Sequence, residues 1–523
     1  MAILRWRKLF AALVVVVCFG CAPLHRDAAK LPSSALPPKS DTSAARYVQS
    51  EVSVHQSESG FRLLTNATNA LMSRIALADH AAHSIDLQYF IFQNDATGRL
   101  VAQRLLAAAD RGVRVRMLLD DFGLDREYDL LDALDAHANI EVRVFNPFRT
   151  RAKLLPAKVV QLVLEWRRLN RRMHNKSFIV DGTTAVIGGR NIGDAYFDAA
   201  DTSNFRDLDV IAIGPVVPEA SRSFDEYWNS DAAVPVAAFG KKRDPQRDLN
   251  RERDALAHDA RAFAQSDYAQ AAIDDFPNGP SADRAGSWFW GSAVLVADQP
   301  EKVQAERDEP ALRIGPKLKQ VVDGAQHEVL LTSPYFVPGK TGTQYLSSLV
   351  QRGVTTKVLT NSLAATDEPP AHAGYSHYRR DLLGAGVLLY ELLPLPGSVQ
   401  APTAYGTSSG VSLHAKSVVV DRRYVFIGSM NMDQRSKLLN TEMGVIVDSP
   451  SLAKAVGDFF DRATAPTSAY RLELKDGSHG GTHLVWVMQE NGATRTFEHE
   501  PGASAQRRLE TLVLRMLPID GLL

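Results

Sequence analysis

The chain has 523 residues, and its 59 basic and 60 acidic side chains leave a formal net charge of −1. This length exceeds what one ordinary hydrophobic core holds, so it predicts two domains of roughly 150 to 250 residues. The balance of charge excludes a global positive field that would attract nucleic acid, although a local basic patch is not excluded. The two cysteines, Cys18 and Cys21, lie at the N-terminus, which excludes disulfides and thiolate metal sites from the folded body.

Residues 1–23 have the pattern of a targeting segment, in which a basic start precedes an apolar run over residues 9–19. That run is too short to cross a bilayer as a helix, which needs about 20 residues. The Gly-Cys21 pair that follows resembles the lipobox of bacterial lipoproteins, in which the cysteine is acylated. Cys18 departs from that pattern, and an ordinary signal peptide or an uncleaved anchor is the alternative. Residues 24–55, rich in Pro and Ser, predict a flexible tether.

The body of the chain contains the same α/β unit twice. A strand-like run at 83–95 precedes a helix and a strand at 98–121, and residues 327–362 repeat this order. The Arg-Gly-Val triplet that begins at Arg111 recurs at Arg352, 241 positions later. This indicates duplication of a unit of over 150 residues rather than a short-period solenoid. Alternating strands and helices predict a mostly parallel or mixed sheet covered by helices in each half.

These patterns predict the domain boundaries. The first α/β domain spans residues 56–238 and the second spans residues 311–465. Residues 239–310 between them are polar and charged, which is typical of a solvated helix or connector. Residues 466–523 contain short strand-like pieces and then an amphipathic helix that ends near Pro518. The length and polarity of this helix favour a packing element over a membrane anchor.

Each unit carries one chemically distinctive motif. The first places His174 and Lys176 two positions apart, followed by Asp181 and by Gly-Gly-Arg-Asn191. The second unit repeats these spacings 240 positions later with His414, Lys416, Asp421, Ser429 and Asn431. On a strand, residues i and i+2 face the same side, so each histidine shares a surface with its lysine.

These residue types suit a phosphodiester substrate. Imidazole titrates near neutrality, so one histidine can attack while the other holds a proton. Two ammonium groups make a cationic pocket for an anion whose charge spreads over its oxygens during transfer. The pair permits a double displacement through a covalent phosphohistidine. Neither motif has the cysteine or carboxylate pattern of a metal site, so we expect no metal and no cofactor.

Each component alone has a plainer explanation. A His-x-Lys on a strand edge is usually a solvated surface feature, Asp181-Gly182 makes a good hairpin turn, and paired glycines let strands approach closely. A single match also carries a false-positive risk of roughly a few per cent in a chain this long. Two copies at identical spacing, inside matching repeats, favour the functional interpretation.

The paired His-x-Lys-x4-Asp-x6-Gly-[Gly/Ser]-x-Asn motif resembles that of the phospholipase D superfamily, over roughly residues 60–465. Wider stretches resemble the bacterial cardiolipin synthase C branch, among them DLQYFIF, RGVRVRMLLDD, LNRRMHNKSFIVDG, GGRNIGDAYF and LLNTEMG. The resemblance implies an α/β fold of two α/β/α sandwich halves, whose mixed sheets face each other across one shared active site. The lipobox-like segment is a departure from that branch.

The resemblance also implies roles for the motif residues. His174 is expected to attack phosphorus, and His414 to protonate the departing alcohol. Asp181 and Asp421 are interpreted as structural supports rather than chemical participants. Contacts to the substrate phosphate are expected from Lys176, Lys416, Asn191, Ser429 and Asn431.

In this superfamily an acidic residue orients each histidine by accepting its second ring N–H. Spacing indicates Asp207, 33 residues after His174, and Glu442, 28 residues after His414. We therefore expect each acid to hold the histidine of its own half. Asp209 is the alternative to Asp207, and either carboxylate could instead cap a loop.

Residues 149–172 precede the first motif and mix aliphatic side chains with Arg, Lys and Trp166. As a helix, this segment would either lie at a headgroup interface, where cations meet anionic lipid, or pack on the domain with its charges in water. The sequence favours neither alternative.

These features favour a phosphatidyltransferase that loads His174 from a phospholipid donor and passes the group to phosphatidylglycerol, giving cardiolipin. Attack by water would make it a phospholipase D-type hydrolase, and a nuclease or other phosphodiesterase is the further alternative. The intact motifs disfavour a lipid-binding scaffold with a dead site. We expect phospholipids and a membrane surface as partners, without nucleic acid or an obligate protein partner. The expected location is the bacterial cell envelope, with Cys21 lipid-anchored and the protein facing the periplasm.

Overall fold

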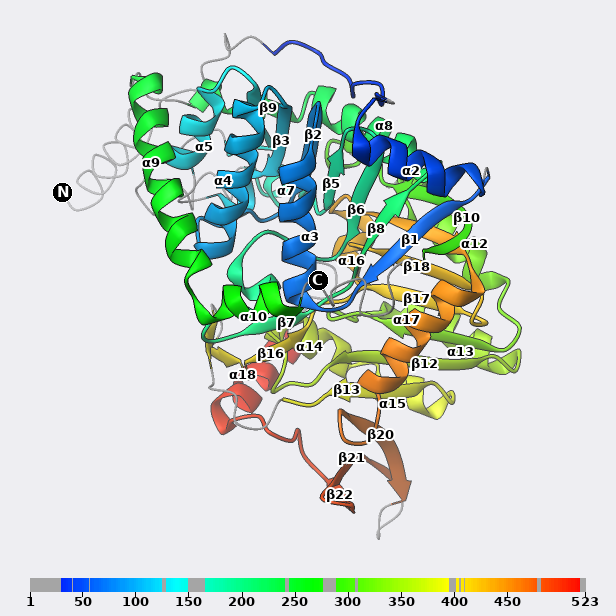
Figure 1. The fold of residues 1–523 in the computed structure, drawn as a ribbon. Helices are drawn as coiled ribbons and strands as arrows, with labels where there is room; N and C mark the ends of the chain where they lie inside the picture. The colour runs from blue at the N-terminus through cyan, green and yellow to red at the C-terminus, as the bar shows by residue number, and fades with distance from the viewer. Residues whose placement is uncertain are drawn as a thin grey trace, which may run out of the picture.

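The computed structural model arranges the chain as two stacked halves (Figure 1). The residues that it describes are 30–39, 41–55, 57–124, 128–148, 165–239, 244–275, 288–305, 309–394, 401–403, 406–408, 410–476 and 481–517. The predicted targeting segment with Cys21 lies outside them, as do residues 149–164 of the segment before the first motif.

The first half is built on a mixed sheet in which β2, β3 and β4 are parallel and the other neighbours are antiparallel. In sheet order the strands are β9 (Ala233–Pro235), β4 (Ile140–Phe145), β3 (Arg114–Asp120), β2 (Ser84–Tyr89), β5 (Ser177–Val180), β6 (Thr184–Gly188), β8 (Asp209–Ile213) and β1 (Ser59–Leu64). The central strand β2 is buried at every position, as helices on both faces of a sheet require.

The second half repeats this sheet and extends it at one edge. In sheet order its strands are β19 (Met443–Asp448), β18 (Tyr424–Gly428), β17 (Ser417–Val420), β11 (Glu328–Thr332), β12 (Thr355–Asn361), β13 (Leu388–Leu392), β20 (Ala469–Asp476), β21 (Thr482–Glu490) and β22 (Ala493–Phe497). The strand-like pieces expected after residue 466 therefore continue the second sheet.

Helices cover both faces of each sheet. Two of them, α8 (Val216–Asn229) and α17 (Pro450–Ala463), supply Phe224 and Phe460 to one apolar core that both halves share. The opposite faces carry separate cores. Their helices are α3 (Ala67–His80), α4 (Ala96–Asp110) and α5 (Tyr128–Asp135) in the first half, and α12 (Gly315–Asp323), α13 (Gly339–Gln351), α14 (Pro369–Ser376) and α15 (Arg379–Gly384) in the second. The predicted fold of two α/β/α halves is confirmed.

The polar interval between the halves is structured. It contains α9 (Pro245–Ala264), which buries Leu249 and Leu256 against the first half and leaves its other faces largely to solvent. A short helix, α10 (Asp267–Asp275), follows. Next, β10 (Phe289–Ala297) pairs at its start with β1 and at its end with β19, so one strand joins the two sheets.

The prediction of a flexible tether is wrong for residues 30–39, which run along the surface of the first half. The Ser33 carbonyl accepts from the Arg116 guanidinium at 3.0 Å, and the Ala35 amide donates to Asp225 at 2.8 Å. Helix α2 (Ser43–Ser53) follows. The extended chain is held by side chains from β3 and α8. A local pattern of Pro and Ser does not predict such contacts with distant elements.

The last described helix is α18 (Ala505–Arg515), which lies beside α14 (Figure 1). Among the described helices, none is both long enough and apolar enough to cross a membrane. The predicted amphipathic C-terminal helix is thus present, and the direction of its apolar face is considered below.

Candidate active site

The two motifs lie where the halves meet. His174 and His414 lie three positions before the first residues of β5 and β17, which pair with β2 and β11. Each histidine is tied to the backbone of the other half: the His174 amide donates to Thr441 at 2.9 Å, and the His414 amide donates to Arg206 at 2.7 Å. The second contact extends a two-stranded parallel sheet of β7 (Asn204–Arg206) and β16 (Val411–Leu413).

The acids that hold the histidines are crossed between the halves. Nδ1 of His174 lies 2.8 Å from Oε2 of Glu442, and Nδ1 of His414 lies 2.5 Å from Oδ2 of Asp207. The prediction that each acid serves its own half is therefore wrong, although the two acids themselves were found from spacing. Since Nδ1 is occupied in both rings, Nε2 is the nitrogen left for a substrate.

Burial and neighbouring charges shift the pKa values of the two histidines and of the acids that hold them. Burial lowers the pKa of His174 well below the usual value, and Lys176 adds to this effect. It also lowers the pKa of His414 to about 4, and raises the pKa of Glu442 to about 7. Burial opposes ionisation of Asp207 as well, but the neighbouring His414 outweighs it, so the pKa of Asp207 lies below its ordinary value. In the free enzyme both imidazoles are therefore neutral. The carboxylate that stays ionised is Asp207, beside His414.

Both lysines are buried beside the histidines. Lys176 Nζ donates to the carbonyl of His174 at 2.7 Å, and Lys416 Nζ donates to the carbonyl of His414. Burial lowers the pKa of Lys176 to about 7 and that of Lys416 to about 8. An anion that enters between them would restore their charge, because an opposite charge nearby favours the protonated form.

The residue two positions before the asparagine of each motif differs between the halves. Ser429 donates to Glu442 Oε2 at 2.5 Å, so it supports the acid that holds His174. Its counterpart Gly189 has no room for a side chain, because a Cβ there would overlap the carboxylate of Asp207. The sequence had placed Ser429 among the residues that contact phosphate.

The two asparagines also differ in their partners. Asn191 accepts from the Ile91 amide at 3.1 Å through Oδ1. Asn431 is buried, and its Oδ1 accepts no hydrogen bond from the described part of the chain. The Oδ1 atom of Asn431 is therefore available to a ligand, since buried polar groups are otherwise paired.

Asp181 and Asp421 lie away from the histidines, and their carboxylates hold the backbone at the start of a neighbouring strand. The Asp181 carboxylate accepts from the amides of three consecutive residues before β2, and Asp421 does the same before β11. Both residues have φ of +53°, at the turn after the motif strand. These contacts agree with their interpretation as structural supports.

Sequence reasoning missed the aromatic rings around the histidines. Phe90 packs edge-on against His174 at 5.2 Å between ring centroids, and Tyr196 and Phe205 pack against His414 at 5.3 and 5.0 Å. The ring centroids of Tyr335 and His414 lie 6.5 Å apart. The only available signal was the position of Phe90 and Tyr335, which follow the ends of β2 and β11.

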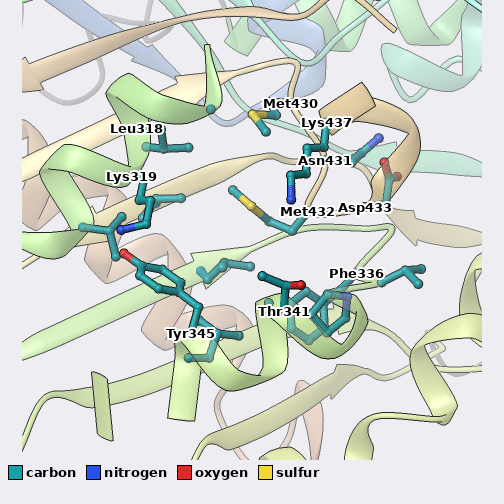
Figure 2. A pocket seen from close by; sticks show the side chains of 18 of the residues that line it. Leu318, Lys319, Phe336, Thr341, Tyr345, Met430, Asn431, Met432, Asp433 and Lys437 are labelled. Carbon is teal, nitrogen blue, oxygen red and sulfur yellow. The ribbon is translucent and has the colours of Figure 1, made fainter. Parts of the chain in front are cut away.

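A cavity of about 440 Å³ adjoins the second motif, between α12, α13 and the chain from Met430 to Lys437 (Figure 2). Its wall is mostly apolar and includes Leu318, Phe336 and Met430, while Asn431 reaches it from the motif. The bridge that pairs Phe336 with Met432 forms part of this wall. Neither catalytic histidine lines the cavity, so it is distinct from the phosphodiester site.

The cavity exists because the duplication is imperfect. In the first half, Arg74 donates to Asp209 at 2.9 Å and to the Tyr89 hydroxyl at 3.0 Å, and Arg190 reaches Asp209 at 3.3 Å. Matching strand registers place smaller or apolar residues at these positions of the second half. The replacements are Ser333 for Tyr89, Met430 for Arg190 and Gly444 for Asp209, and Leu318 lies as many positions before β11 as Arg74 lies before β2.

Comparison with known proteins agrees with this geometry. A family model described as "Cardiolipin synthase, PLD-like domain" matches residues 74–228 and 318–464. The chain belongs to this family. It is therefore an enzyme of the phospholipase D superfamily, which comprises phosphatidyltransferases and phosphodiesterases, as the paired motif predicted.

Individual members of the cardiolipin synthase family extend the match over most of the chain. Cardiolipin synthase C of Escherichia coli (strain K12) is 37% identical over 480 residues, which cover 90% of this chain and 98% of that protein. A cardiolipin synthase of Staphylococcus aureus is 24% identical over 421 residues, covering 80% and 68% respectively. The phosphatidylserine synthase of Haemophilus influenzae Rd KW20 shares the fold, with a TM-score of 0.53, 13% identity and coverage of 91% of this chain and all of that one.

Proposed function

We propose that the protein makes cardiolipin by moving a phosphatidyl group from a donor phospholipid to a hydroxyl of phosphatidylglycerol. The supporting observation is the pair of buried histidines, each with Nδ1 held by a carboxylate of the opposite half. Such a pair leaves two Nε2 atoms to act on one phosphodiester. The similarity to Escherichia coli cardiolipin synthase C supports the choice of product.

In the first step, the Nε2 lone pair of His174 attacks phosphorus, and the bond from phosphorus to the donor alcohol breaks. The departing oxygen takes a proton from Nε2 of His414. His414 enters this step protonated because the bound phosphate and Asp207 both raise its pKa. Burial lowers the pKa of His174 well below its ordinary value, which keeps that ring neutral and nucleophilic.

In the second step, His414 accepts the proton of the phosphatidylglycerol hydroxyl as its oxygen bonds to phosphorus. The nitrogen–phosphorus bond then breaks, and His174 returns to its neutral form. Lys176 and Lys416 neutralise the phosphoryl oxygens in both steps, with Asn191 and Asn431 nearby. General acid–base help of this kind is worth about 10² to 10⁴ in rate.

Incubation of the purified protein with defined phospholipids, in the presence of EDTA, tests this function. Product masses should show cardiolipin formed from phosphatidylglycerol, and chelation should leave the rate unchanged because lysines supply the positive charge. Phosphatidic acid as the main product would make the protein a hydrolase. Cleavage of nucleic acid without lipid turnover would support the nuclease alternative instead.

We also infer that the protein is held at the bacterial envelope through acylated Cys21, facing the periplasm. The support is the basic start, the short apolar run and the Gly-Cys21 pair. Intact-mass analysis of protein from membranes should show residues 1–20 removed and lipid on Cys21. An unprocessed N-terminus would refute this inference.

A further inference from the structure

Helix α18 is amphipathic, but its buried side chains are polar and its apolar stripe is exposed. Helices at a protein surface normally turn their apolar stripe toward the core. In α18 the buried side chains are Arg507 and Thr511, each 5% exposed, and Leu514 is half-buried. Arg507 donates to the backbone carbonyl of Thr366, and Arg508 donates to that of Glu500 at 2.7 Å. The helix is thus fixed to the second half by polar contacts.

The apolar stripe of α18 faces solvent. It consists of Leu509, Leu512, Val513 and Met516, at positions i, i+3, i+4 and i+7, followed by Leu517, and these side chains are 48–72% exposed. Five of the 13 large apolar side chains exposed by the described residues therefore fall within nine positions. Apolar residues gathered in this way mark an interaction site, whereas scattered ones do not.

Hydrogen bonds and a ring contact connect α18 to the surroundings of His414. Thr366, which accepts from Arg507, precedes Asp367, and Asp367 accepts from the Tyr335 hydroxyl at 2.7 Å. Tyr335 in turn packs near His414. Figure 1 shows α18, in red, next to α14.

We propose that the apolar stripe of α18 inserts into the interfacial region of a lipid bilayer and sets the catalytic site against its lipid substrate. This rests on the proposed function, because only a lipid-processing enzyme needs its site at a bilayer surface. An 11-residue helix is too short to span a bilayer, so it would lie in the plane of the interface. Arg508 and Arg515, both exposed, flank the stripe and suit anionic headgroups.

The decisive experiment separates surface binding from chemistry. We compare the full-length protein with the double variant Leu512→Asp/Val513→Asp on two substrates: vesicles of phosphatidylglycerol and phosphatidylethanolamine, and short-chain phosphatidylglycerol dissolved as monomers. Turnover on vesicles should fall by roughly tenfold or more, while turnover on monomers stays unchanged. Ile273→Asp is the matched control, because Ile273 is 47% exposed on α10 and lies outside the stripe. It should leave both rates unchanged.

Hydrogen exchange gives a readout that needs no catalysis. Amides of residues 505–517 should exchange more slowly when vesicles are added to the parent protein, and this protection should be absent in the double variant. Loss of turnover on both substrates, or no protection of α18 by vesicles, would overturn the proposal. Self-association that the double variant abolishes would identify a second copy as the occupant and also overturn it. Protection without any phospholipid turnover would retain the docking surface and reject the proposed function.

Discussion

At the level of single residues, the two histidines are not equivalent. Asp207 stays ionised beside His414, whereas burial raises the pKa of Glu442, the partner of His174, to about 7. A fixed negative charge stabilises a protonated imidazole, and its absence favours a neutral one. This difference supports His174 as nucleophile and His414 as acid and base.

Substitution of each histidine tests these roles with a nitrophenyl donor, whose leaving group departs without a proton. His174→Ala should lose all turnover, because no covalent adduct forms. His414→Ala should load the enzyme and then stall, because nothing activates the second alcohol, with a loss of about 10² to 10⁴ in rate. Peptide mapping after a rapid quench should find phosphorus on His174. An adduct on His414 would reverse the roles.

The buried lysines predict the pH dependence. Since burial lowers the pKa of Lys176 to about 7 and that of Lys416 to about 8, the free enzyme loses positive charge as the pH rises through this range. A bound phosphate restores both charges. We expect kcat/KM for the donor to fall above about pH 7 to 8, and kcat to hold to higher pH, since the two constants report free and bound enzyme. Parallel profiles of the two constants would contradict this explanation.

At the level of secondary-structure elements, the two halves differ in what fills the space between a helix and its sheet. Between α3 and its sheet, Arg74 and Asp209 form a buried ion cluster. Between α12 and its sheet, the same volume is the cavity lined by Leu318 and Met430. Removal of one partner from a buried ion cluster leaves an uncompensated charge, whereas an apolar side chain that enters an existing cavity gains contacts.

Two matched substitutions should therefore change stability in opposite directions. Arg74→Leu should lower the free energy of unfolding by about 3–5 kcal/mol, because Asp209 loses a buried partner. Leu318→Phe, at the equivalent position, should raise it by about 0.5–2 kcal/mol by filling part of the cavity. Denaturant midpoints of the full-length variants measure both effects. Destabilisation by Leu318→Phe would mean that the cavity walls do not accept added volume.

At the level of the whole molecule, the site belongs to both halves of one chain. Each histidine is held by an acid of the other half, and the halves share one apolar core. Neither half therefore contains a complete catalytic pair, and an active site needs both motifs in one folded chain.

Mixing inactive variants tests this conclusion. His174→Ala and His414→Ala should not restore activity to each other when combined, because each chain keeps its own defective site. An equal mixture of the parent protein and His414→Ala should show about half of the activity of undiluted parent, which controls for inhibition. Recovery of activity in the mixture of variants would show that sites assemble between chains.

The sequence alone determined the duplicated α/β unit and most of the site. Strand and helix periodicity is local, and the 240-residue repeat identifies equivalent positions without any coordinates. The pair of motifs therefore pointed to His174 and His414, and spacing found Asp207 and Glu442. Asp181 and Asp421 were interpreted as supports from the resemblance to the superfamily, and Asp181-Gly182 is in addition a local turn signal.

Only the tertiary structure decided what depends on docking of distant segments. The acids Asp207 and Glu442 each hold the histidine of the opposite half because the two halves meet at the motifs. Residues 30–39 are held by groups about 80 to 200 positions away, so their local composition is uninformative. The periodicity of α18 revealed that it is amphipathic, but its apolar face turns outward because Arg507 binds Thr366. Periodicity defines faces, and only the neighbours of an element decide which face is buried.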